Sequence, residues 1–135
     1  MALNRSQVMA RIRSKGTRLE ERFKSLIREA GLKVRRGDAL FGRPDFRVLP
    51  QDTLVFVNSC FWHGCRWHCR LPHSRRSYWV PKIRRNVQRQ REVVKELRRD
   101  GHSVVVIWEH TIQRSPERVI QKLLKASLVK PHRLR

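Results

Sequence analysis

The stretch "GRPDFRVLPQDTLVFVNSCFWHGC", residues 42–65, decides the fold. It contains two candidate strands, 45–49 and 53–58, separated by the turn-forming residues "PQD". The second strand is apolar from Leu54 to Val57 without alternation, which is typical of a strand buried on both faces. If the two strands are antiparallel neighbours, the start of the first lies beside the end of the second. Asp45 and the loop 58–63 would then meet at one edge of a sheet.

Helices and further strands are predicted on both sides of this stretch. Apolar residues recur at spacings of three and four over residues 17–30, where Gly31 ends the helix. Residues 32–36 and 102–108 predict strands, residues 75–99 predict a long helix, and residues 115–128 predict a helix with Ser115 as N-cap and Pro116 at its first position. This order indicates an α/β fold with a mixed central sheet flanked by helices. We expect one domain over residues 1–135, with a basic N-terminal arm (1–16) and a flexible tail (129–135).

The charge of the chain indicates a polyanionic partner. Lys and Arg number 32 against 11 Asp and Glu, which gives a net charge of +21 over 135 residues. Most of these cations are Arg, whose planar fork matches phosphate oxygens, so nucleic acid is favoured over an anionic membrane surface. The chain lacks a run of the roughly 20 apolar residues that a membrane span needs. Its first 16 residues lack the apolar region of a signal peptide. We therefore expect an intracellular protein whose thiols stay reduced.

Three cysteines, Cys60, Cys65 and Cys69, follow the second strand with the spacing C-x4-C-x3-C. Thiolates in a reducing compartment favour zinc, and a structural zinc site takes four tetrahedral ligands. The sequence leaves the fourth ligand open among His63, His68, His73 and His110. The alternative is that the three cysteines are small buried apolar residues.

Asp45 and His63 are candidates for phosphate chemistry. A carboxylate at a strand edge can hold Mg²⁺, which prefers oxygen ligands and waters. A nearby histidine can carry a proton at neutral pH. Alternatively, Asp45 forms an ion pair with Arg43 or Arg47, and His63 is a zinc ligand. The spacing does not choose between these interpretations.

The segments "GRPDF", "FVNSCFWHGC", "RRSYWVPKIRRNVQRQR" and "VVVIWEH", in this order, resemble the very-short-patch repair (Vsr) endonuclease family. The resemblance extends from about residue 4 to residue 112. It implies a restriction-endonuclease-like core with a structural zinc and a requirement for Mg²⁺. It also implies strand-specific nicking of DNA, 5′ of the thymine in T:G mismatches that arise when 5-methylcytosine is deaminated.

The resemblance assigns roles to individual residues. Asp45 would bind Mg²⁺ together with the backbone carbonyl of Asn58, His63 would handle the attacking water, and Glu20 would support it. The zinc ligands implied are Cys60, Cys65, Cys69 and His110. Phe61 and Trp62 would wedge into the base stack beside the mismatch, and Met9 would insert from the other groove. From the residues alone, Glu20 can instead cap the turn at Thr17, and Phe61 and Trp62 can pack in a core.

Two positions depart from the family pattern. Asn58-Ser59 stands where known members carry Thr-His, so a second active-site histidine is missing. Cys65 stands where a histidine zinc ligand is familiar, which affects only the ligand set. The first departure keeps an alternative function open, a zinc-stabilised protein that binds mismatched or distorted duplexes without cutting them. A third class is an RNA-binding module that stacks bases on its aromatic residues.

The resemblance also implies partners and a location. We expect a monomer that acts on double-stranded DNA carrying a T:G mismatch, with mismatch-repair proteins as candidate partners. The expected location is the bacterial cytoplasm, in association with the nucleoid.

Overall fold

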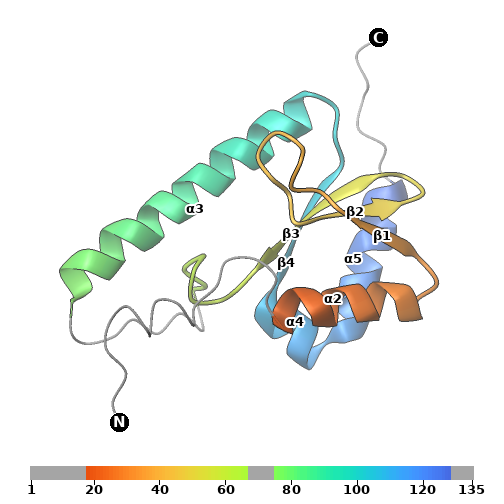
Figure 1. Ribbon diagram of the computed structural model, residues 1–135, viewed down its shortest axis with the longest axis horizontal. Coiled ribbons are helices and arrows are strands. Elements are labelled where there is room, and N and C mark those ends of the chain that lie inside the picture. Colours follow the sequence, from red (N-terminus) through yellow and green to blue (C-terminus); the bar gives the residue numbers. More distant parts are fainter. Residues whose placement is uncertain (1–17, 67–74, 129–135) are drawn as a thin grey trace.

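The computed structural model describes residues 18–66 and 75–128 of the chain (Figure 1). The expected N-terminal arm and C-terminal tail, together with Met9, Thr17, His68, Cys69 and His73, lie outside the described residues. The described elements, in chain order, are α2 (Arg18–Glu29), β1 (Lys33–Arg36), β2 (Phe46–Leu49), β3 (Thr53–Asn58), α3 (Arg76–Arg99), β4 (Val104–Trp108), α4 (Glu109–Arg114) and α5 (Pro116–Leu128).

The four strands form one mixed sheet in the order β1-β2-β3-β4. The β1–β2 and β2–β3 pairs are antiparallel, and Phe46 at the start of β2 lies opposite Val55 in β3. Strands β3 and β4 are parallel, with Asn58 opposite Trp108, so both strands end at the same edge of the sheet. The predicted α/β class and the antiparallel pairing of the two central strands are therefore confirmed.

Helices cover both faces of the sheet (Figure 1). On one face, Phe23 and Ile27 of α2 and Val119 and Leu123 of α5 pack in one core cluster with alternate sheet residues. On the other face, Val94 and Leu97 of α3 pack in a cluster with the intervening sheet residues. All six residues of β3 are buried, as expected for a strand covered on both faces.

The predicted elements match the observed ones closely, with one omission. The short helix α4 follows β4 directly and was not expected from the sequence. Its six residues are too few to show a helical period of apolar side chains, so the sequence carries little signal for it. None of the described helices combines the length and the apolar character that crossing a bilayer would require.

Candidate active site and metal centre

A cavity of about 510 Å³ lies between α3 and the edge of the sheet where β2 begins. Its lining residues are Gly42, Arg43, Asp45, Phe56, Val57, His63, Asn86, Arg89, Gln90 and Val93. The cavity thus brings together Asp45 and His63, which were singled out from the sequence, with polar residues from the middle of α3. Three residues of α3 at this site, Asn86, Arg89 and Gln90, were not predicted from the sequence. A periodic pattern shows which residues share a face of a helix, but not which part of the protein that face packs against.

Asp45 is held at the cavity by the pairing of β2 with β3. Its backbone N–H donates to the carbonyl of Val55 (2.9 Å), and its Oδ2 accepts the backbone N–H of Val57 (2.7 Å). Arg47 donates to Asp52 at 2.7 Å through both Nε and Nη2, so one of the two expected alternative partners of Asp45 is already engaged with another carboxylate. The other, Arg43, lines the same cavity as Asp45. A carboxylate has about four acceptor positions, so the bond from Val57 leaves Asp45 able to coordinate a cation.

The hydrogen-bonding pattern of β3 favours another carbonyl than that of Asn58 beside Asp45. The N–H and C=O groups of successive strand residues point to opposite neighbours. In β3, Val55 and Val57 bond toward β2, whereas the N–H of Leu54 donates to Ser103 beside β4 (2.8 Å). By this alternation the carbonyl of Val57 faces the Asp45 side and that of Asn58 faces β4. Val57 lines the cavity with Asp45, and Asn58 is not among the lining residues.

The side chain of Asn58 is instead paired with α3. Its Nδ2 donates to Gln90 Oε1 (2.7 Å), and Gln90 Nε2 donates to Asn58 Oδ1 (2.8 Å). Asn58 is only 1% exposed, whereas Gln90 is half-buried and lines the cavity, so the Asn58 side of the pair is shielded from water. The pair ties the end of β3 to the middle of α3.

His63 lies on the cavity wall in the loop after β3. Burial, with a smaller contribution from the positive charge of Arg89, lowers the pKa of His63 to about 4. Its imidazole is therefore neutral near pH 7 and can accept a proton, but it is a weaker base than an unperturbed histidine. Its Nδ1 atom is buried, with no hydrogen-bond partner within the described part of the chain. His63 is also absent from the described Cys/His cluster, which argues against its alternative role as a zinc ligand.

Glu20, in the first turn of α2, is 3% exposed and does not line the cavity. It accepts a hydrogen bond from Arg36 Nη1 (2.8 Å), and the Arg36 guanidinium lies over the Phe46 ring at 5.1 Å. The pKa of Arg36 is raised, mainly by the hydrogen bond from its guanidinium to Glu20 and to a smaller extent by other carboxylates, including Asp45. Glu20 is thus connected to the Asp45 region through Arg36.

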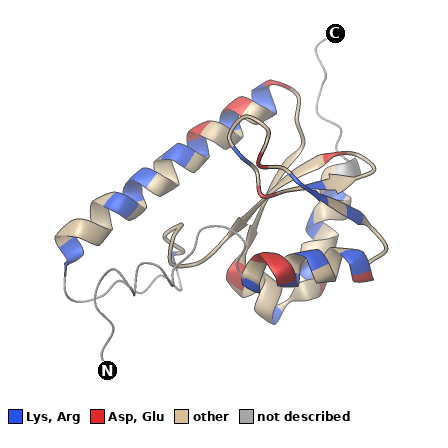
Figure 2. Ribbon diagram, viewed as in Figure 1, with Lys and Arg blue, Asp and Glu red and all other residues tan. Residues whose placement is uncertain are grey.

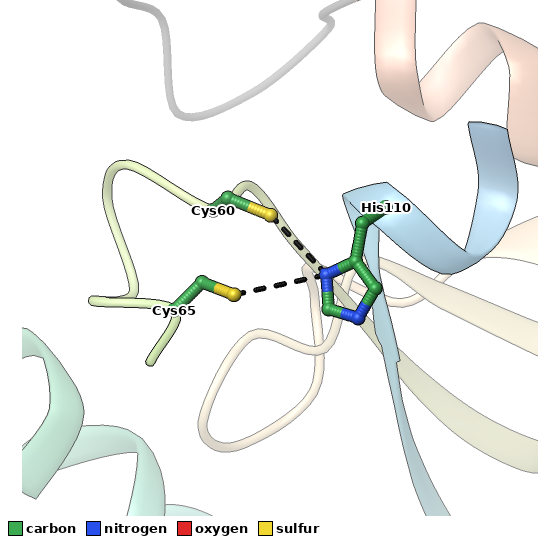
Figure 3. Close-up of side chains that lie close together, drawn as sticks. All are labelled: Cys60, Cys65 and His110. Carbon is green, nitrogen blue, oxygen red and sulfur yellow. Dashed lines mark hydrogen bonds between the residues drawn. The ribbon is translucent and has the colours of Figure 1, made fainter. Parts of the chain in front are cut away.

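Cys60, Cys65 and His110 form a cluster in which all ligand atoms lie within 4.8 Å of one another (Figure 3). His110 Nδ1 is 3.4 Å from Cys60 Sγ and 3.7 Å from Cys65 Sγ. Zn–S bonds of about 2.3 Å and Zn–N bonds of about 2.0–2.1 Å, at tetrahedral angles, place S and N about 3.5 Å apart. These three side chains therefore fit a zinc ion. The fourth predicted ligand, Cys69, lies outside the described residues.

The surroundings of Cys60 also fit a metal site. Burial raises the pKa of the Cys60 thiol to about 12, so the thiol is protonated unless a metal displaces the proton. Glu109, the residue before His110, accepts the backbone N–H of Cys60 through Oε1 (2.9 Å). Glu109 was not singled out in the sequence. Its hydrogen bond connects the loop after β3, which contains Cys60 and Cys65, to α4, which contains His110.

Phe61 and Trp62 belong to an aromatic cluster at the start of α3. Both are half-buried and meet Trp79 in edge-to-face geometry, with ring centroids 5.1 and 6.1 Å away. Lys82 Nζ lies 5.2 Å from the centroid of the Trp62 ring. The packing interpretation of Phe61 and Trp62 thus holds for this conformation, although neither side chain is fully buried.

Comparison with known proteins identifies the family. A family model described as DNA mismatch endonuclease Vsr matches residues 2–69. The chain is 36% identical over 128 residues to the DNA mismatch endonuclease Vsr of Escherichia coli (strain K12), covering 92% of this chain and 80% of that protein. The chain belongs to the Vsr family of DNA mismatch endonucleases.

Other relatives of this Vsr-family chain are nicking enzymes. The type II nicking enzyme V.XorIIP of Xanthomonas oryzae pv. oryzae is 43% identical over 110 residues, 78% of this chain and 79% of that enzyme. The type II nicking enzyme V.NaeI of Lentzea aerocolonigenes is 37% identical over 112 residues, 78% of this chain and 68% of that enzyme. Membership of the Vsr family places the chain among DNA endonucleases and confirms the resemblance recognised in its sequence motifs.

Proposed function

We propose that this protein is a Mg²⁺-dependent nickase that cuts one strand of duplex DNA 5′ of the thymine in a T:G mismatch, on a restriction-endonuclease-like core. The observation that carries the proposal is the shared cavity of Asp45 and His63 in a chain of the Vsr family. A carboxylate, a neutral imidazole and an arginine around one cavity are suited to phosphodiester hydrolysis.

In this proposal Asp45 holds Mg²⁺ together with a backbone carbonyl at the end of β3. The alternation of β3 favours the carbonyl of Val57 over that of Asn58 as this second oxygen. One carboxylate, one carbonyl and several waters match the way Mg²⁺ is usually bound. When bound, Mg²⁺ supplies positive charge to the phosphate and lowers the pKa of water.

His63 accepts the proton that the attacking water loses, since burial keeps its imidazole neutral at physiological pH. Glu20 acts indirectly, by fixing the guanidinium of Arg36 in the region of Asp45. No second histidine lines the cavity among the described residues. Within the described part of the chain the proton transfer therefore depends on His63, whereas His68 and His73, the candidates for a second imidazole, lie outside it.

The aromatic pair Phe61 and Trp62 inserts beside the mismatch, and Met9 inserts from the opposite groove. A mismatched step is already weakened, so unstacking it costs less than unstacking a paired step. Zinc, held by Cys60, Cys65, Cys69 and His110, stabilises the loop that presents the aromatic pair and His63. The ligand separations around His110 support this assignment.

A nicking assay on end-labelled duplexes tests the proposal. Each duplex carries one T:G mismatch in a varied flanking sequence, with a T:A duplex as control, in Mg²⁺ or in EDTA. We expect a Mg²⁺-dependent nick 5′ of the thymine, in that strand only, and no nick in the T:A duplex. Mismatch binding without a nick in every context would contradict the proposal and favour a recognition protein. Tighter binding of single-stranded RNA would favour an RNA-binding module.

A further inference from the structure

Arg89 is a cation on the wall of the candidate active site. Cations occur along the whole length of α3 (Figure 2), but among the residues that line the cavity only Arg43 and Arg89 are basic. Arg89 faces the same cavity as Asp45 and His63.

The Arg89 guanidinium is exposed and is hydrogen-bonded to Asn86. Arg89 Nη2 donates to Asn86 Oδ1 (2.8 Å), and Asn86 Nδ2 donates to the backbone carbonyl of Trp62 (3.2 Å). The two bonds together orient the Asn86 amide, since its oxygen must face the guanidinium and its nitrogen the carbonyl. A guanidinium restrained in this way loses less conformational freedom when it binds an anion.

The same asparagine connects two parts of the site. Trp62 belongs to the aromatic pair proposed to enter the base stack, and its carbonyl is bonded to the residue that orients Arg89. Asn86 therefore sets the position of Arg89 relative to Trp62. If the aromatic pair enters the base stack of a duplex, the DNA backbone beside it would lie near Arg89, whose position relative to Trp62 is set by Asn86.

We propose that Arg89 binds the phosphate that is cut and stabilises the negative charge that builds up on its non-bridging oxygens. This rests on the proposed nicking function. In the reaction, the oxygen of water bonds to phosphorus and its proton passes to His63. One phosphorus–oxygen ester bond breaks, and its electron pair leaves with the sugar oxygen, which takes up a proton from solvent. The two-pronged Arg89 guanidinium holds the oxygens that do not leave. Asn86 is a positioning residue in this scheme.

The test measures binding rather than cutting, and uses a T:G duplex in which the phosphate 5′ of the thymine is replaced by a neutral methylphosphonate. Affinities of the full chain are measured in EDTA for the native and the methylphosphonate duplex. We expect the wild-type protein to bind the methylphosphonate duplex about tenfold more weakly. Arg89→Gln should bind the native duplex about tenfold more weakly and should show no further loss with the methylphosphonate.

Arg85→Gln is the matched control, because Arg85 is exposed on the same helix and does not line the cavity. It should keep the tenfold difference between the two duplexes. The role of Arg89 would be overturned if the methylphosphonate weakened binding equally in wild type and Arg89→Gln. It would also be overturned if the methylphosphonate did not weaken binding in wild type. Arg89→Lys should recover part of the single-turnover nicking rate lost in Arg89→Gln. If neither the wild type nor any variant nicks DNA, but the methylphosphonate effect is still lost in Arg89→Gln, the phosphate contact stands and the nicking proposal fails.

Discussion

Asn58 and Gln90 exchange two hydrogen bonds, at 2.7 and 2.8 Å, across the interface between β3 and α3. Neither amide carries a charge, and neither belongs to an apolar periodic pattern, so their pairing could not be predicted from the sequence. The pair lies beside the cavity, because Gln90 also lines its wall. Its main effect is to hold α3 at a fixed distance from the strand that positions Asp45.

Gln90→Leu should destabilise the protein by about 2 kcal/mol, because it leaves the buried Asn58 amide without these two bonds. Gln88→Leu is the control, since Gln88 is exposed and bonds only to Glu92 among the described contacts. We expect the control to change the free energy of unfolding by less than about 0.5 kcal/mol. Urea denaturation measures both. Similar values for the two variants would mean that the Asn58–Gln90 pair adds nothing to stability.

Gly42 and Gly31 share a left-handed backbone, with φ of +79° and +80°, but differ in their surroundings. A Cβ atom at Gly31 would meet nothing within 4 Å, whereas one at Gly42 would collide with Val93 of α3. We expect Gly31→Ala to cost about 1 kcal/mol from backbone strain alone. Gly42→Ala should cost about 3 kcal/mol, because overpacking adds to the strain. Equal losses in thermal and urea unfolding would contradict the close packing of this loop against α3.

At the scale of elements, the cluster of Cys60, Cys65 and His110 joins the loop after β3 to the start of α4. The parallel pairing of β3 with β4 creates this junction, since it brings the ends of both strands to one edge. Cys60 and His110 are far apart in the chain, and the register of β3 and β4 brings them close together in space. A zinc ion here would fix the orientation of the loop that contains Phe61, Trp62 and His63.

Cys60→Ser and His110→Ala should each lower the zinc content of the purified protein well below one ion per chain. Each should also lower the melting temperature by about 10 °C, because a structural zinc contributes folding free energy directly. His102→Ala is the control, since His102 is exposed and lies outside the cluster. Elemental analysis and thermal unfolding provide the two readouts. Full zinc occupancy in Cys60→Ser would show that Cys60 is not a ligand.

The elements themselves could be predicted from the sequence, because apolar spacing sets them locally. The helix predicted over 75–99 is α3, and the buried apolar run 54–57 lies within β3. The assembly of the site could not be predicted to the same degree. Which carbonyl of β3 faces Asp45 depends on strand register, and which arginine of α3 enters the cavity depends on how the helix is rotated on the sheet. Register and rotation are set by tertiary packing, which periodicity does not encode.

At the scale of the molecule, the net charge of +21 dominates the expected behaviour toward DNA. Figure 2 shows Lys and Arg along α3 and on the helices of the opposite face. Each phosphate that is neutralised steepens the slope of log Kobs against log salt concentration by about 0.9. With about six phosphate contacts, we expect a slope near −5 for a mismatched duplex. Fluorescence anisotropy at several salt concentrations measures the slope, and a value shallower than about −2 would contradict an extended phosphate interface.

The central claim is that the cavity containing Asp45 cuts DNA, and the nicking rate of Asp45→Asn tests it most directly. Asparagine keeps an oxygen that can accept the N–H of Val57 but removes the charge that would hold Mg²⁺. The measurement compares wild type and variant under single-turnover conditions on one T:G duplex, with affinity and melting temperature determined on the same samples. We expect nicking to slow by about a thousandfold, with affinity changed by less than about threefold. An unchanged nicking rate would contradict the claim, as would a parallel loss of rate, affinity and thermal stability.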